Sequence, residues 1–184
     1  VLELGTNHPG ELEPLVLMSA PNYGIITAIG REHLEFFGDL EGVAREEGML
    51  GELLPSGGKL FLYGESQWSK PIAARSAAPV CTVGLGAGND WRAEAVRVLP
   101  DGVVFKAVGA MSGEYRLGLL GRHQVTNALL AMAVAAELGV PEETVRTGLA
   151  ECRSPHRRLQ LSEVNGIRIL DDAYNANADS VNVS

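Results

Sequence analysis

The segment 170–180 concentrates side chains that can bind a small ligand. Two carboxylates, Asp171 and Asp172, close an apolar run, and the Tyr174 phenol and the amides of two asparagines follow within a few residues. So many hydrogen-bonding groups directly after a strand suit a loop that faces a ligand better than they suit a hydrophobic core. The sequence therefore predicts a binding loop at this point of the chain.

Two further chemically useful side chains, Glu3 and His33, follow or close apolar runs. Residues 1–4 and 23–29 are apolar and predict strands, the second without alternation, as in a strand buried on both faces. A short helical pattern over 11–18 joins them, which predicts a right-handed strand–helix–strand unit. Ligands bind beyond the carboxyl ends of such strands. We therefore expect Glu3 and His33 at one edge of a parallel sheet.

A third candidate, Glu47, sits inside a helical pattern. Asp39 is typical of a helix N-cap, and the helix is expected to run to about Leu54. Steps of three and four residues place Glu47 on the inward stripe with apolar residues. A carboxylate there is costly unless it is paired or binds a metal ion.

The remaining pattern predicts an α/β fold, in which a mostly parallel sheet is flanked by helices and carries a small antiparallel subregion. Strands are expected at 59–63, 79–83, 92–98, 103–108 and 115–120, and helices at about 124–138 and 141–153. The dipeptide Asp101-Gly102 is a strong hairpin signal. A basic linker, 154–158, then leads to a hairpin over 159–170.

Composition excludes several classes of function. The chain of 184 residues has a formal net charge of -8, so nucleic acid and anionic membranes are not expected as partners. No apolar run is long enough to span a membrane, and no secretion signal is visible. Cys81 and Cys152 have no metal-ligand spacing, which favours a reducing cytoplasm. Because the chain opens on Val1 in an apolar run, we expect it to be a piece of a longer protein.

Several blocks of the sequence, in the same order, resemble the Mur ligases. The likeness is greatest to the members that add D-alanyl-D-alanine to a UDP-N-acetylmuramoyl-tripeptide in peptidoglycan precursor synthesis. Several blocks in order are specific, whereas any one alone is weak. The blocks are 3–11 (ELGTNHPGE), 29–38 (IGREHLEFFG), 121–133, 158–160 (RLQ) and 171–180 (DDAYNANADS).

The resemblance implies an ATP-dependent ligase that forms an amide bond through an acyl phosphate, with Mg²⁺ as cofactor. It implies that residues 1–153 are part of a central ATP-binding domain. Residues 154–184 would then be a linker and the start of a Rossmann-like C-terminal domain.

The same resemblance assigns roles to individual side chains. Mg²⁺ prefers oxygen ligands, so only the resemblance places His33 on the metal. Asn127 matches an amide that reads adenine, and Arg158 matches a phosphate contact. The full expected set is Glu3, His33 and Glu47 for the metal; Asn127, His123, Arg158, Asp172 and Tyr174 for ATP; and His33, Glu47 and Arg158 for catalysis.

Three departures from the family pattern stand out. Glu47 occupies the position of a lysine that the family carbamylates, and we hypothesise that its carboxylate serves a second metal directly or through water. Gln124 replaces an asparagine. The phosphate loop Gly-x-x-Gly-Lys-[Ser/Thr] and most of the C-terminal domain are missing, so we expect this chain alone to bind ATP poorly and to be inactive.

Alternatives to these assignments stay open at the level of sequence. Glu3 can be a surface carboxylate, Asn127 a helix-terminus residue, Arg158 part of a solvated linker and Tyr174 a packing residue. The whole protein can be another Mur-type amide ligase with a different amino-acid substrate. It can also be a catalytically dead relative that binds nucleotide. An intact phosphate loop in the upstream sequence would argue against that alternative.

Overall fold

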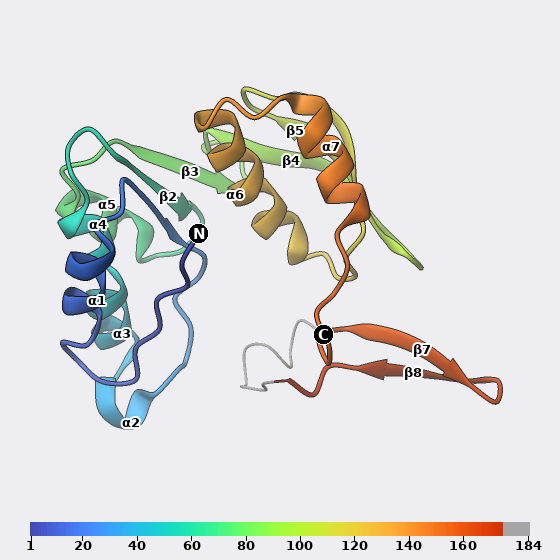
Figure 1. Ribbon diagram of the computed structural model, residues 1–184, viewed down its shortest axis with the longest axis horizontal. Helices are drawn as coiled ribbons and strands as arrows, with labels where there is room; N and C mark the ends of the chain where they lie inside the picture. The colour runs from blue at the N-terminus through green and yellow to red at the C-terminus, as the bar shows by residue number, and fades with distance from the viewer. Residues whose placement is uncertain (175–184) are drawn as a thin grey trace. The chain divides into compact units, whose positions relative to one another are not determined.

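The computed structural model describes residues 1–174, and the described chain forms two compact units that divide between Trp91 and Arg92 (Figure 1). The first unit is α/β and the second combines an antiparallel sheet with two helices and a separate hairpin. Within the described residues, no helix has the length and apolar character needed to cross a membrane.

The first unit is built on three parallel strands. β1 (Tyr23–Ile26) pairs with β2 (Lys59–Tyr63), which pairs with β3 (Val80–Gly84). The helices of this unit are α1 (Leu12–Ser19), α2 (Leu34–Phe37), α3 (Leu40–Glu47), α4 (Met49–Leu53) and α5 (Ser69–Arg75). Its core is aliphatic, with Ile26, Leu54, Leu60, Leu62 and Ile72 packed together. The mostly parallel α/β architecture predicted from the sequence is confirmed in this unit.

Near the N-terminus, one strand prediction is wrong and another is confirmed only in part. Residues 1–4 form no strand, and the side chains of Val1 and Leu2 are exposed. β1 is also shorter than expected and alternates. Gly24 and Ile26 are buried, whereas Tyr23 and Ile25 are 38% and 39% exposed. Successive residues of a strand point to opposite faces, so only the face that carries Gly24, against Leu50 and Leu54, is covered.

The predicted helix from Asp39 to Leu54 exists but is interrupted. The Asp39 carboxylate accepts a hydrogen bond from Gly42 N at 2.9 Å, which confirms the N-cap. Gly48 then separates α3 from α4, and a Cβ at this position would collide with the Arg75 guanidinium. The short helices α2 and α5 have no counterpart among the predicted elements, because four to seven residues show too little periodicity to detect.

The second unit contains the predicted antiparallel sheet. β4 (Trp91–Leu99), β5 (Gly102–Val108) and β6 (Gly113–Leu117) are consecutive neighbours. The predicted hairpin between β4 and β5 is present, but its turn residues are Pro100 and Asp101, because Gly102 already pairs with Leu99. Helix α6 (Gln124–Glu137) contacts β5, and α7 (Glu142–Glu151) packs against β6. The Tyr115 phenol links the last pair by donating to Glu142 Oε1 at 2.8 Å.

The predicted hairpin after the linker is present. β7 (Gln160–Val164) and β8 (Ile167–Asp171) form a two-stranded antiparallel sheet of their own. Most of its apolar side chains are exposed, including Leu161, Ile167 and Leu170. The predicted domain boundary at 153/154 lies between α7 and this hairpin and stays a prediction. The last part of the predicted binding loop, 175–180, lies outside the described residues.

Candidate functional site

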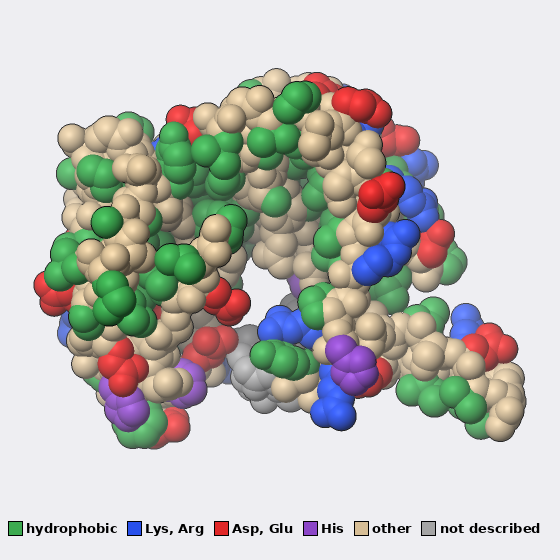
Figure 2. All heavy atoms as spheres, in the orientation of Figure 1, with side chains coloured by type: hydrophobic (Ala, Val, Ile, Leu, Met, Phe, Trp, Pro, Cys, Tyr) green, Lys and Arg blue, Asp and Glu red, His purple; other side chains and the backbone are tan. Residues whose placement is uncertain are grey.

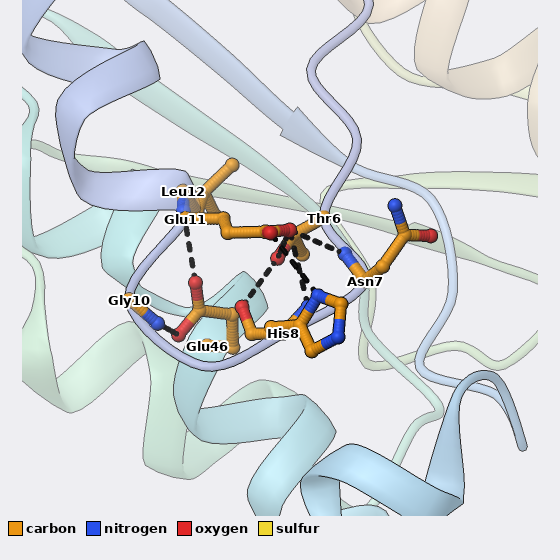
Figure 3. Close-up of polar contacts among 7 residues, drawn as sticks. All are labelled: Thr6, Asn7, His8, Gly10, Glu11, Leu12 and Glu46. Atoms are coloured by element: carbon orange, nitrogen blue, oxygen red, sulfur yellow. Dashed lines mark hydrogen bonds and ion pairs between the residues drawn. The ribbon is translucent and has the colours of Figure 1, made fainter.

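The loop that precedes α1 is organised around Glu11 (Figure 3). The Glu11 carboxylate accepts hydrogen bonds from the backbone N–H of Asn7 at 2.8 Å and of His8 at 3.1 Å, and Oε1 lies 3.1 Å from His8 Nδ1. The Asn7 and His8 N–H groups, followed by the His8 ring, hold the pKa of Glu11 below its usual value despite a smaller opposing effect of burial. The block 3–11 therefore folds into a hydrogen-bonded turn.

A buried carboxylate from α3 supports the same loop. Glu46 is 7% exposed and accepts from Gly10 N at 2.8 Å and from Leu12 N at 2.9 Å (Figure 3). Leu12 opens α1, whose first N–H groups have no partner within the helix, and the positive end of the helix dipole favours an anion there. Glu46 therefore caps α1 from another helix. Sequence reasoning missed this role.

Glu47, the predicted inward carboxylate, is half-buried instead of fully buried. Burial is the main reason that its pKa is raised, and the nearby carboxylates of Glu32 and Glu46 raise it further. The surroundings of Glu47 thus destabilise its charged form, and a bound cation would stabilise it. Glu32, directly before His33 in sequence, is the neighbour that sequence reasoning did not single out.

The structure joins the two blocks that carry the remaining metal candidates. The His8 ring packs on the Phe36 ring with centroids 4.0 Å apart, which connects the loop before α1 to α2. His33 is the exposed residue that precedes α2, and Glu3 is exposed in the irregular segment before the loop. Figure 2 shows histidine and acidic side chains gathered on the surface around α2.

These side chains do not form a ready-made metal centre. Across residues 1–174, no three His, Cys, Asp or Glu side chains are arranged to hold a metal ion. Glu3, His33 and Glu47 are therefore not assembled as three ligands of one ion. Their metal-binding roles stay predictions, which rest on carboxylate chemistry and on the position of Glu47.

The second unit brings together residues predicted to bind ATP. At the start of α6, Asn127 Nδ2 donates to Gln124 Oε1 at 3.0 Å, and Gln124 Nε2 lies 3.1 Å from His123 Nε2. Gly121 adopts φ +96°, and a Cβ there would lie 2.6 Å from the His123 ring and 3.3 Å from the Leu159 side chain. The His123 ring and the Leu159 side chain thus both lie beside Gly121.

Leu159 and its neighbours in the linker contact the residues predicted to bind phosphate and ribose. The Leu159 backbone N–H donates to Asp172 Oδ1 at 3.1 Å. The Arg158 guanidinium lies over the Tyr174 ring, 4.3 Å from its centroid, and Tyr174 N donates to the Arg157 carbonyl at 3.0 Å. The linker and the segment after β8 are therefore joined. Arg158, Asp172 and Tyr174 belong to this set of contacts, whereas His123 and Asn127 are joined to each other through Gln124.

Comparisons with known proteins identify the family. The description "Mur ligase middle domain" matches residues 1–135. The chain belongs to the Mur ligase family. Among curated Mur ligases, the UDP-N-acetylmuramoyl-tripeptide–D-alanyl-D-alanine ligase of Mycobacterium tuberculosis is 33% identical over 98% of this chain. The ligase of the same name from Escherichia coli is 31% identical over 98%.

Solved Mur ligase structures share the fold. A MurF structure from Acinetobacter baumannii superposes with a TM-score of 0.93 over the whole chain, at 29% identity. A MurF ligase from Thermotoga maritima, solved in complex with ADP, gives a TM-score of 0.85 at 19% identity, which bears on the fold alone. The chain spans only 36% and 41% of the lengths of the Mycobacterium tuberculosis and Escherichia coli relatives.

Proposed function

We propose that the protein carrying this chain is an ATP-dependent ligase that adds D-alanyl-D-alanine to a UDP-N-acetylmuramoyl-tripeptide, a step of peptidoglycan synthesis. The observation that carries the proposal is the breadth of the likeness. Relatives named for this reaction match 98% of the chain at 31–33% identity, in the Mycobacterium tuberculosis and Escherichia coli proteins. The contacts of Gln124 with His123 and Asn127, and those of Arg158 with Tyr174, support it.

In this reaction the tripeptide carboxylate takes the γ-phosphoryl group of ATP, and the amine of D-alanyl-D-alanine then displaces phosphate from the acyl phosphate. We propose that Asn127 and His123 hold the base and that Asp172 contacts the ribose. Arg158 would contact phosphate. Stacking on Tyr174 suits this role, because a guanidinium that stacks through its face keeps its N–H donors free at the edge.

We propose Glu3, His33 and Glu47 as ligands of the Mg²⁺ ions, with His33 and Glu47 acting in catalysis through that contact. Bound Mg²⁺ neutralises phosphate charge and polarises the phosphoryl oxygens. Cys81 and Cys152 form no disulfide within the described residues, and this together with the acidic composition supports a cytoplasmic location without nucleic-acid or membrane partners.

The test is phosphate release by the full-length protein with ATP, Mg²⁺ and the UDP-linked tripeptide. We expect release that depends on D-alanyl-D-alanine. Release that instead depends on another amino acid or peptide would replace this assignment with another Mur-type ligase. ATP binding without release under any of these conditions would indicate a nucleotide-binding relative.

A further inference from the structure

Gln124 connects two side chains that are expected to face ATP. It is the first residue of α6, so Asn127, three positions later, lies on the same side of the helix. The Gln124 oxygen accepts from Asn127 Nδ2 at 3.0 Å, and the Gln124 nitrogen lies 3.1 Å from His123 Nε2. One amide therefore uses its acceptor toward Asn127 and its donor toward His123.

In the orientation that the structure gives the two amides, this contact fixes which atoms Asn127 can offer to a ligand. One N–H of its amide is used by Gln124, so the Oδ1 acceptor and the second N–H remain on an exposed side chain. An acceptor flanked by one donor matches adenine, whose amino group donates beside ring nitrogens that accept. It matches guanine poorly, because the keto oxygen of guanine is an acceptor at the corresponding position.

The same contact sets the tautomer of His123. With the Gln124 amide in this orientation, its nitrogen donates, so His123 Nε2 accepts and a neutral ring carries its proton on Nδ1. Nδ1 is buried and makes no hydrogen bond within the described part of the chain. The position of this proton is a consequence of the Gln124 orientation that can be measured without nucleotide.

We propose that Gln124 is a positioning residue for the nucleotide base. It holds the Asn127 amide with its oxygen outward and thereby favours adenine over guanine. This inference rests on the proposed ATP-dependent function and concerns a residue at which this chain departs from the family pattern. Because Gln124 acts through Asn127, its replacement is expected to change the preference for ATP over GTP, whether or not the overall affinity for nucleotide also changes.

The first experiment compares dissociation constants of ATP and GTP, measured by calorimetry on the full-length protein. Gln124→Glu keeps an acceptor toward Asn127 and should keep the preference for ATP within about twofold. Gln124→Lys presents only donors, so Asn127 should turn its oxygen inward, and the preference should fall by about fivefold or more. The added charges act on the phosphates of both nucleotides equally, so the ratio is insensitive to them.

Gln124→Met is the matched control, since it has similar length and no amide. It frees Asn127 to rotate, and the loss of preference should lie between those of the two charged variants. Equal ATP-to-GTP ratios in the wild type and in the Glu and Lys variants would overturn the proposal. The wild-type protein could show the expected ATP-to-GTP ratios and yet release no phosphate in response to D-alanyl-D-alanine. That result would reject the ligase reaction and leave the role of Gln124 standing.

The second experiment needs no nucleotide. The ¹⁵N chemical shifts of the His123 ring should show the proton on Nδ1 in the wild type. In Gln124→Glu the carboxylate can only accept, so the proton should move to Nε2. A wild-type ring protonated on Nε2 would contradict the orientation of Gln124 from which the proposal follows.

Discussion

Among the described residues, Glu47 is a carboxylate whose surroundings would favour a bound cation. Its carboxylate is half-buried, and burial together with Glu32 and Glu46 raises its pKa. If it serves a metal ion, Glu47→Gln should weaken binding of Mn²⁺, used as a paramagnetic substitute for Mg²⁺, by about tenfold or more. Electron paramagnetic resonance of the full-length protein measures free and bound Mn²⁺.

Glu41→Gln is the control for that measurement. Glu41 lies on the same helix, and its side chain is 67% exposed beside Arg45. Its replacement should leave Mn²⁺ binding unchanged. Identical Mn²⁺ affinity in the wild type and Glu47→Gln would remove Glu47 from the metal site.

Arg158 gives a second test at the residue scale. Arg158→Lys keeps the charge and loses both the planar donor fork and the stacking on Tyr174. We expect the KM for ATP to rise by about tenfold in the full-length enzyme, whereas Arg157→Lys, one residue earlier in the linker, should change it by less than about twofold. Tyr174→Phe should behave as the wild type because the ring is kept. Equal effects of the two arginine variants would mean that the linker contributes only general positive charge.

At the scale of elements, Glu46 determines how the loop before α1 is held. Glutamine has one acceptor oxygen, so Glu46→Gln leaves either Gly10 N or Leu12 N opposite an amide N–H group. We expect a loss of about 1–3 kcal/mol in the free energy of unfolding, measured by urea denaturation. The exposed Glu41→Gln variant should stay within about 0.5 kcal/mol of the wild type. A similar small effect at Glu46 would show that the buried contacts are not needed.

Glu65 holds a glycine-rich segment that follows β3. Its carboxylate accepts from the backbone N–H groups of Leu85 and Gly86 and from the side chain of Asn89. Burial acts to raise its pKa, but the hydrogen bonds from Gly86, Tyr63, Leu85 and Asn89 together lower it below the usual value of 4.5.

A carboxylate whose pKa is lowered by folding stabilises the folded state above its unfolded pKa, and the contribution disappears as the pH falls through the folded value. Hydrogen-exchange protection of the Leu85 and Gly86 amides should therefore be constant above about pH 4.5 and decline below it. Glu65→Gln should reduce this protection at neutral pH and abolish its decline at low pH. If protection in the variant declined at low pH by the same amount as in the wild type, another carboxylate would be responsible for the decline.

At the scale of the whole molecule, the predicted site residues fall into two sets. The metal candidates Glu3, His33 and Glu47 lie in the first unit, and the ATP candidates belong to the second. The parallel strands and the antiparallel hairpins were predictable because each has a strong local pattern. The division between Trp91 and Arg92 was not, because it depends on contacts between residues far apart in sequence.

The sequence by itself determined the family and most elements. Ordered motif blocks, the Asp39 cap and the hairpin between β4 and β5 depend on residues close together in the chain, so they can be recognised without a structure. Only the tertiary structure decided that Glu46 caps α1 while Glu47 is half-buried, and that Gln124 lies between His123 and Asn127. In a helix, consecutive side chains point about 100° apart, so the packing of neighbouring elements decides which of two adjacent carboxylates is buried.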